Sequence, residues 1–311
     1  MTLEQLRIFV AVAEREHMTR AAEMLGLTQS GVSAAIAALE ARYATPLFHR
    51  VGRRVELTAS GRLFLDEAKA VLARAEAAER ALAELGGMKR GRLALHSSQT
   101  IASYWLPAKL VAFRRKYPGI EVSLSIGNTA QVAAAVRSGA ADLGFVEGAV
   151  DDPALAQETV AGDQLVVVVG RAHPWFGRKS VAANDLTQTD WVLREPGSGT
   201  RSEFALALRR FGIELHSLRI TLELPSNEAV RAAVEAGAGA TAISELLVEL
   251  SLRAGTLHRV PFALPRRSFS AVSHRERHRS KAADALVAMI GTPDAKQRPA
   301  AAKERPKKKA H

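Results

Sequence analysis

The chain has 311 residues, of which 47% are hydrophobic and 24% are charged, the composition of an ordinary globular protein. It contains no cysteine, which excludes disulfides, thiolate metal sites and cysteine nucleophiles. No run approaches the roughly 18 apolar residues that a membrane span requires, and no secretory signal is apparent. We therefore expect a cytoplasmic protein without a membrane partner.

The formal net charge of +11 is spread unevenly along the chain. Residues 293–311 alone contain seven Lys or Arg and two Asp or Glu, a net charge of +5. This segment is rich in Pro, Ala and Lys and has no apolar periodicity, so we expect a disordered basic tail. It is either a solubilising extension or a non-specific DNA tether that acts through counterion release.

Residues 18–40 (MTRAAEMLGLTQSGVSAAIAALE) hold two short segments with helical apolar spacing, separated by a polar turn. Gly26 ends the first segment, because a residue without a Cβ readily adopts the left-handed conformation at a helix end. Thr28 or Ser30 can cap the second, whose apolar residues recur on one face. Two helices joined in this way predict a helix-turn-helix, and the second helix has the right size for the major groove.

An earlier helix, from Leu3 to about Glu16, supplies apolar side chains that close a small core. After the helix pair, PLFHRVGRRVELT (46–58) fits a β-hairpin with Gly52 at its tip. Three arginines near that tip suit phosphate or minor-groove contact: Arg50, Arg53 and Arg54. A pair of helices alone more often serves core packing than DNA recognition. The first helix, the helix pair and the basic hairpin in this order, however, predict DNA binding.

Residues 58–88 contain no proline and no turn signal after Gly61. Their apolar residues alternate at spacings of four and three, which is a coiled-coil seam: Phe64, Ala68, Val71, Ala75, Ala78, Leu82 and Leu85. Thr58 or Ser60 can cap the start of this helix, and Gly86-Gly87 ends it. A helix with charged flanks and one narrow seam is better explained by a partner helix than by a globular core, so we predict homodimerisation.

From Arg92 onward, strand-like and helix-like segments alternate, the pattern of α/β units. The expected strands are 92–98, 120–127, 142–148, 165–170, 191–195, 218–226 and 268–276. The expected helices run through Lys109 to Tyr117 and over 129–138, 200–212, 227–237 and 280–291. The elements fall into two sets, and we expect the last strand and helix to return to the first set.

In open α/β sheets, ligands bind beyond the carboxyl ends of the strands, where helices begin. Small polar residues occupy those positions here, and helix starts with nearby hydroxyls favour an anion. Arg201 could supply a counter-charge, and Glu147 could contact a donor on the ligand. Each turn taken singly is more often ordinary helix capping. The candidate effector-binding residues are Ser98, Gln99, Thr100, Thr129, Glu147, Ser198, Thr200 and Arg201.

Signals for chemistry are weak throughout the chain. GSGTR (197–201) lacks the Gly-Lys-Ser/Thr ending of a phosphate loop. His274 and His278 are four residues apart, but neighbouring arginines would repel a metal cation. No catalytic motif is found, so we expect no catalytic residues, no metal site, no cofactor and no enzyme activity.

Five stretches together resemble LysR-type transcriptional regulators, and the similarity covers about residues 1–292. They are LEQLRIFVAVAE, AAEMLGLTQSGVSAAIAALE, PLFHRVGRRVELTASG, REPGSGTR (194–201) and SNEAVRAAVEAGAG (226–239). The resemblance implies an α/β protein with an N-terminal helical, winged helix-turn-helix, a long linker helix, and two Rossmann-like lobes of periplasmic-binding-protein type. It also implies homodimers or homotetramers that act at promoters, with RNA polymerase as a further candidate partner.

The resemblance also implies which residues of the second helix touch DNA, namely Thr28, Gln29, Ser30 and Ser33. Ala34 and Ala35 stand where such regulators usually carry polar residues, which removes base contacts. Within the family, the lobes look like the branch that regulates sulfite and sulfur metabolism and carbon-dioxide fixation. A small oxyanion or carboxylate is therefore the expected effector.

These observations predict a DNA-binding domain over 1–58, a linker helix over 59–91, a two-lobed effector-binding domain over 92–292 and a basic tail over 293–311. The predicted function is a regulator of promoter activity that binds double-stranded DNA and responds to a small, anionic effector between the lobes. The alternative is a stand-alone small-molecule-binding protein without promoter-specific DNA recognition. An enzyme would leave residues 1–58 unexplained.

Overall fold

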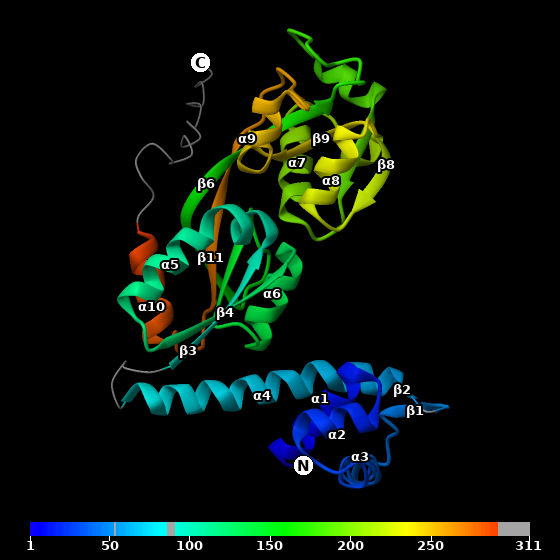
Figure 1. Cartoon of the computed structure of the whole chain (residues 1–311), viewed down its shortest axis with the longest axis vertical. Coiled ribbons are helices and arrows are strands. Elements are labelled where there is room, and N and C mark those ends of the chain that lie inside the picture. Colours follow the sequence, from blue (N-terminus) through cyan, green and yellow to red (C-terminus); the bar gives the residue numbers. More distant parts are fainter. Residues whose placement is uncertain (53, 86–90, 292–311) are drawn as a thin grey trace, which may run out of the picture. The chain divides into compact units, whose positions relative to one another are not determined.

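The computed structural model describes residues 1–52, 54–85 and 91–291. The chain divides into two compact units, one formed largely by residues 1–88 and the other largely by residues 89–311 (Figure 1). Each unit has its own hydrophobic cores. The predicted tail over 293–311 lies outside the described residues.

The first unit begins with a head of three helices and a hairpin. Its elements are α1 (Leu3–Arg15), α2 (Met18–Leu25), α3 (Gln29–Tyr43), β1 (Phe48–Val51) and β2 (Arg54–Leu57). The predicted helix-turn-helix is confirmed: Gly26 ends α2 with a φ of 67°, and Thr28 Oγ1 accepts a hydrogen bond from Gly31 N (3.1 Å) at the start of α3. Gly52 turns the hairpin with a φ of 62°.

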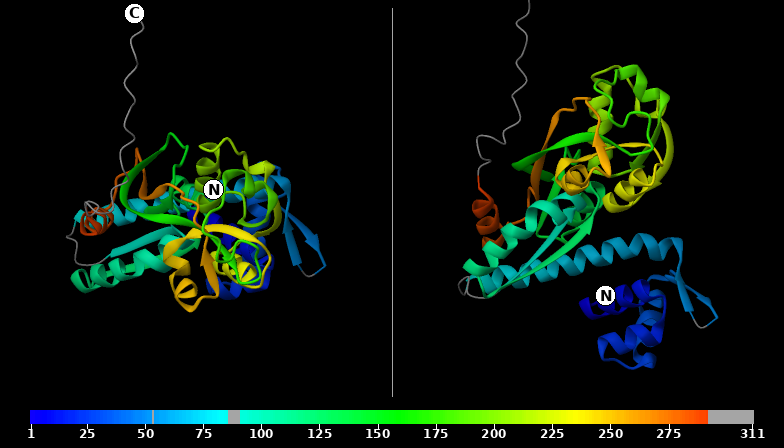
Figure 2. Two further views of the ribbon diagram at one scale, coloured as in Figure 1. Left: turned by 90° about the horizontal axis from the view of Figure 1, so that it is seen from above. Right: turned by 45° about the horizontal axis from the view of Figure 1, so that its top comes forward.

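The head continues into α4 (Ala59–Leu85), a helix of 27 residues that forms one unbroken rod in the right-hand view of Figure 2. Thr58 Oγ1 accepts a hydrogen bond from Gly61 N (2.8 Å), so Thr58 is the cap. The first seam residues, Phe64 and Ala68, pack on the core of the head itself. The later seam residues Val71 and Leu82 are 42% and 70% exposed.

The second unit is built on one continuous set of strands. They are β3 (Gly91–Ser98), β4 (Ile120–Gly127), β5 (Leu143–Glu147), β6 (Leu155–Gly170), β7 (Asp190–Arg194), β8 (Arg219–Leu224), β9 (Ala240–Ser244), β10 (Leu257–Arg259) and β11 (Arg266–His274). Their order is β4-β3-β5-β11-β6-β9-β7-β8, and β10 pairs with β6. β3 is parallel to β4 and β5, whereas β11 is antiparallel to β5 and β6.

β6 divides this set into two lobes. Residues 155–164 of β6 pair with β11, and residues 165–169 pair with β9. The helices of the first lobe are η1 (Ile101–Trp105), α5 (Leu106–Lys116), α6 (Thr129–Ser138) and α10 (Lys281–Ile290); the second lobe has α7 (Gly199–Arg209), α8 (Asn227–Glu235) and α9 (Glu245–Ala254). Phe269 and Leu286 share a core with Leu95, which confirms that the last segments return to the first lobe.

Several features differ from the sequence-based expectation, among them β10, which was not predicted. β6 begins at Leu155, ten residues before the expected strand. Its first half was not predicted, because polar residues and Gly162 interrupt the apolar run there. β9 was not predicted, since its sequence ATAIS is short and rich in small residues. A π-helical turn, η1, precedes α5.

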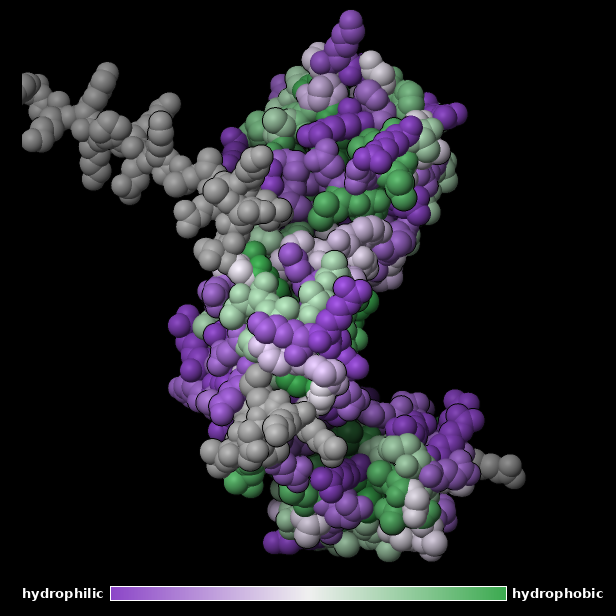
Figure 3. Space-filling view, turned by 60° about the vertical axis from the view of Figure 1, so that its left-hand side comes forward, coloured by the Kyte–Doolittle hydropathy of each residue, from purple (hydrophilic) through white to green (hydrophobic). Residues whose placement is uncertain are grey.

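Among the described residues, no helix combines the length and the apolar character needed to cross a bilayer. The face shown in Figure 3 is mostly hydrophilic, with smaller hydrophobic patches between charged side chains.

Candidate functional site

The start of α3 exposes the polar side chains expected to read DNA. Thr28, Gln29 and Ser30 are exposed and Ser33 is half-buried. Thr28 Oγ1 also lies 3.2 Å from Ser30 Oγ, so the capping interaction fixes both hydroxyls at the helix start. A rigid arrangement of hydroxyl and amide groups at a helix start can contact both phosphates and base edges.

The hairpin places arginines at its tip and at the start of β2. Arg50 and Arg54 are exposed, and Arg53 lies outside the described residues. Sequence reasoning missed the residue that fixes this hairpin to α3. Glu40 of α3 accepts hydrogen bonds from the backbone N–H of Leu47 (2.6 Å) and Phe48 (3.1 Å).

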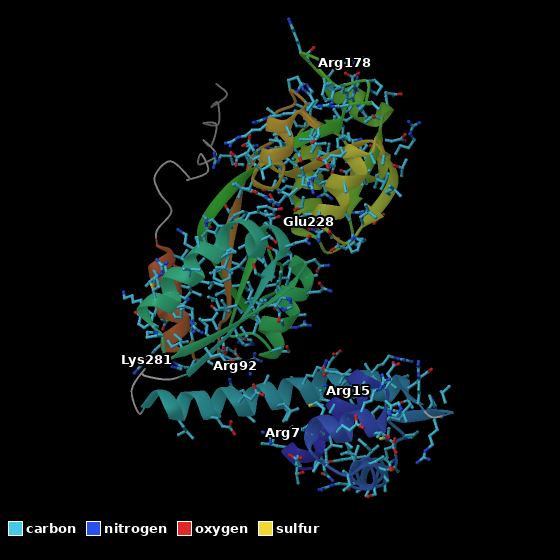
Figure 4. The ribbon with its side chains drawn as sticks, viewed as in Figure 1. Arg7, Arg15, Arg92, Arg178, Glu228 and Lys281 are labelled. Atoms are coloured by element: carbon cyan, nitrogen blue, oxygen red, sulfur yellow. The ribbon has the colours of Figure 1, made fainter. Side chains whose placement is uncertain are left out.

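In the second unit, the end of β3 meets the start of α8 across the two lobes. Gln99 accepts from Asn227 N (2.7 Å) and donates to Glu228 Oε2 (2.9 Å). Thr100 Oγ1 accepts from Asn227 Nδ2 (3.1 Å), and both residues are buried. Figure 4 shows Glu228 at the border between the lobes. These polar residues hold the lobes in one relative orientation.

The start of α6 forms a second crossing with the loop before α7. Asn128 Nδ2 donates to Glu195 Oε1 (3.1 Å). A Cβ placed on Gly199 would lie 2.5 Å from Thr129 Oγ1 and 2.6 Å from the carbonyl oxygen of Glu147. The absence of a side chain at Gly199 therefore lets α7 begin against two of the expected effector-binding residues.

Two buried polar atoms at the ends of first-lobe strands have no hydrogen-bond partner among the described residues. They are Ser98 Oγ, at the end of β3, and Glu147 Oε1, at the end of β5. Both residues are 2% exposed. A buried polar atom without a partner is costly, and such atoms mark places where a ligand can complete the hydrogen bonding.

The expected cation, Arg201, is already paired. Its guanidinium donates to Glu223 Oε2 (2.6 Å) and to the carbonyl oxygen of Arg194 (2.8 Å). Ser198 and Thr200 are buried as expected of a site, and Thr200 Oγ1 accepts from Arg267 (3.0 Å). Arg267 is therefore a cation nearer to the expected site residues, and sequence reasoning missed it.

Arg267 belongs to a buried charged network that spans both lobes. Its guanidinium donates to both carboxylate oxygens of Asp163 (2.5 and 2.9 Å), and Asp163 accepts from Ser244 Oγ (2.5 Å). Burial by itself would lower the pKa of Arg267, but the charge and hydrogen bonds of Asp163, together with the charges of Glu147 and Glu203, raise it. The network joins β11, β6, β9 and the start of α7.

Glu203 of α7 lies beside this network. A Cβ on Gly148, which has a φ of 76°, would lie 2.3 Å from Glu203 Oε1. Burial raises the pKa of the Glu203 carboxyl, and the positive charge of Arg267 only partly offsets this effect. The junction of the lobes therefore contains acidic groups as well as arginines.

One sequence signal could have revealed Arg267. On a strand, alternate residues share a face, so Arg267 faces the same side as the buried Phe269. The expected strand began at residue 268 and left Arg267 in a loop.

Comparison with protein families matches both units. Residues 3–62 match the family described as bacterial regulatory helix-turn-helix protein, lysR family. Residues 86–292 match the LysR substrate binding domain. These are families of transcriptional regulators and not of enzymes.

Two curated relatives align over nearly the whole chain. The HTH-type transcriptional regulator YeiE of Escherichia coli K12 is 36% identical over 284 residues, which are 91% of this chain and 94% of the relative. A probable RuBisCO transcriptional regulator of Trichormus variabilis is 32% identical over 304 residues, 94% of this chain and 90% of the relative. The expected resemblance to regulators of carbon-dioxide fixation is thereby confirmed.

Solved structures agree with this assignment. The crystal structure of CbnR, a LysR family transcriptional regulator, has a TM-score of 0.70 at 24% identity and covers 93% of this chain and 98% of CbnR. The regulatory domain of CcmR from Synechocystis PCC6803, solved with 2-PG, has a TM-score of 0.58 at 27% identity, and the match covers 66% of this chain and all of that domain. With both units matched and relatives aligned along its length, the chain belongs to the LysR family of DNA-binding transcriptional regulators.

Proposed function

We propose that this regulator responds to a small, oxygen-rich anion bound at the junction of the two lobes. The observation that carries the proposal is the pair of buried, unpartnered atoms Ser98 Oγ and Glu147 Oε1. Thr129 and the turn 198–200 approach the backbone of Glu147, and they complete a set of hydroxyl and N–H donors. The related regulatory domain of CcmR was solved in complex with 2-PG, which supports a small anionic compound as the effector.

Glu147 limits the chemical class of the effector. A bare anion would be repelled by Glu147, so the ligand must present a donor, such as a hydroxyl or a protonated oxygen, to its Oε1 atom. Its anionic oxygens would accept from Ser98, Thr129 and the backbone at the start of α7. Arg267 also lies near the expected site and is paired with Asp163. The pair has no net charge, but its positive end faces Thr200 and favours an anion there.

The first experiment is a thermal-shift panel of small oxyanions and carboxylates, including 2-PG, on the full-length protein. A ligand stabilises by RT ln(1 + [L]/Kd), so a true effector raises the melting temperature in proportion to the logarithm of its concentration. Calorimetry on the best compound then compares Ser98→Ala with Ser97→Ala. Ser97 is its matched control, because the Ser97 hydroxyl already donates to the Ser98 carbonyl oxygen.

We expect Ser98→Ala to weaken binding about tenfold, the equivalent of one hydrogen bond of roughly 1.4 kcal/mol, and Ser97→Ala to change it much less. Glu147→Gln removes the carboxylate that repels a bare anion. This variant should therefore bind fully deprotonated compounds better, relative to protonated ones, than the wild type does. Equal affinity in wild type, Ser98→Ala and Glu147→Gln would place the effector elsewhere.

For promoter recognition, we propose that α3 reads base edges through Gln29 while Thr28, Ser30, Ser33 and the hairpin arginines hold the DNA backbone. Gln29→Ala should then cost about 1–3 kcal/mol on a preferred duplex and little on a scrambled one. Arg50→Ala and Arg53→Ala should weaken both duplexes alike and lower the salt dependence. Unchanged affinity in all three variants would contradict this assignment.

We further infer that the regulator acts in the cytoplasm as a homodimer or homotetramer assembled through α4. The exposed apolar side chains of Val71 and Leu82 support this, because they continue the seam beyond the part that the head covers. Two-fold symmetry would give two recognition helices for two half-sites, and RNA polymerase is the expected partner at the promoter.

A further inference from the structure

A basic pocket lies on the head, where the turn between α1 and α2 meets the start of β2. It has a volume of about 300 Å³ and is lined by Arg15, Glu16, His17, Arg20 and Arg54. The lining comes from the end of α1, the turn that follows, the start of α2 and the first residue of β2. Three arginines against one glutamate give this surface a clear excess of positive charge.

The frame of the pocket is fixed by the backbone. Glu16 ends α1 with a φ of 50°, and its carbonyl oxygen accepts from Val55 N of β2 (3.0 Å). This hydrogen bond ties the hairpin to the turn between α1 and α2. The pocket is therefore held together by three elements and does not depend on one side-chain conformation.

The three arginines and the histidine of the pocket have no strong partner among the described residues. Arg20 and Arg54 are exposed, and neither forms an ion pair among the described residues. Arg15 contacts Glu14 only at 3.9 Å, while Glu14 is held at 2.8 Å by Lys69. His17 Nδ1 is buried and has no hydrogen-bond partner in the described part of the chain.

We propose that this pocket binds a phosphate of the DNA backbone and clamps it between α2 and the hairpin. Three guanidinium groups from different directions suit a tetrahedral anion, because each can donate two hydrogen bonds. The location favours DNA as the source: the first helix of a helix-turn-helix crosses the backbone when the second occupies the groove. Arg54 also belongs to the hairpin expected to contact the flanking DNA. The inference rests on the proposed DNA-reading function and adds Arg15, His17 and Arg20 to it.

The test uses the full-length protein and a fluorescent duplex that the wild type enriches from a random pool. Binding is measured by anisotropy over a series of salt concentrations for Arg20→Gln, Arg54→Gln and a control, Arg7→Gln. Arg7 lies on α1, is half exposed and, in the described part of the chain, forms an ion pair with Glu4 at 3.6 Å. Figure 4 shows Arg7 and Arg15 toward opposite ends of α1. The control removes the same charge from the head outside the pocket.

We expect Arg20→Gln and Arg54→Gln to bind about tenfold more weakly, on the enriched and on a scrambled duplex alike, and to reduce the salt slope by about 0.9 for each lost contact. Arg7→Gln should stay within about twofold of wild type. Single neutral methylphosphonate linkages then locate the phosphate: one position should weaken the wild type and Arg7→Gln but leave Arg20→Gln unaffected.

Two outcomes would overturn the proposal. In the first, Arg20→Gln and Arg54→Gln behave like Arg7→Gln. In the second, inorganic phosphate stabilises the wild type but not Arg20→Gln while DNA affinity is the same, which would make the pocket a site for a free anion. A wild type that enriches no duplex would contradict the DNA-reading function itself, so the two failures are distinguishable.

Discussion

At Arg267 the chain places a full positive charge where water cannot reach it. The side chain has no exposed surface, and Asp163, which is 2% exposed, supplies the compensating carboxylate. Breaking such a pair by removing one partner leaves an uncompensated buried charge and costs several kcal/mol. The network at the junction of the lobes is therefore a strong constraint on the second unit.

We expect Asp163→Asn to lower the free energy of unfolding by about 3–5 kcal/mol. Tryptophan fluorescence during urea unfolding measures this, because all three tryptophans belong to the second unit. Glu249→Gln is the control: it removes one charge from an exposed pair with Arg253 and should change stability by less than about 0.5 kcal/mol. Equal effects in both variants would mean that Arg267 does not need this carboxylate.

Glu203 gives a prediction with a defined dependence on pH. Its pKa is raised in the folded protein, so between its ordinary and its raised pKa the folded state holds a proton that the unfolded state has lost. Stability from this group therefore falls as pH rises through that window. Glu203→Gln should gain stability relative to wild type as pH rises above about 4.5.

The control for this prediction is Glu195, whose pKa moves in the opposite direction. Burial raises it, but hydrogen bonds from Arg194 and Asn128 outweigh burial and lower it. Glu195→Gln should therefore lose stability relative to wild type as pH rises from the lowered pKa to the ordinary value of 4.5, and the difference should then stay constant. A stability difference for Glu203→Gln that is flat between pH 4 and 8 would contradict the assigned shift.

At the scale of elements, α4 serves two purposes along its length. Phe64 and Ala68 close the core of the head, whereas Val71 and Leu82, further along the seam, are exposed. The heptad pattern in the sequence does not distinguish these two environments, because an apolar seam packs equally well on the chain's own head and on a partner helix.

Replacing Val71 and Leu82 with Asp should dissociate the protein, because like charges would be buried opposite one another in the seam. Sedimentation at micromolar concentration measures the mass, and tight DNA binding should be lost with the dimer. Leu63→Asp is the control, since Leu63 is 76% exposed and lies outside the seam. A double variant that stays fully oligomeric would place the main interface on another element.

The helices of the head were predictable because their ends carry local signals, such as Gly26 and the Thr28 cap, that need no tertiary contact. β6 was only half predictable. Its first ten residues pair with β11, which lies about a hundred residues later in the chain, and no local pattern reports such a pairing. Asp163 and Arg267 were missed for the same reason, since these partners are 104 residues apart in the sequence.

At the scale of the whole molecule, an effector can act only through a difference in affinity between two states. The hydrogen bonds between the lobes define one of those states. Gln99 and Thr100 hold the start of α8, and Asn128 holds Glu195. The expected effector-binding turns thus also contact the opposite lobe, so binding a ligand there changes the energy of the orientation itself.

Thr100→Val tests this coupling, because it removes the hydroxyl that accepts from Asn227 and keeps the size of the side chain. We expect DNA affinity without a ligand to stay within about twofold of wild type. The change in DNA affinity or footprint on adding the best compound of the oxyanion panel should fall about fivefold, the equivalent of one net hydrogen bond of roughly 1 kcal/mol. Thr187→Val is the matched control, since the half-buried Thr187 hydroxyl donates to the Asn184 carbonyl oxygen and accepts from Gln188, both within the same 3-10 helix and far from Asn227 in the sequence. If both variants respond to the compound as the wild type does, the contact between Thr100 and Asn227 does not carry the signal, and the second crossing through Asn128 and Glu195 becomes the element to test.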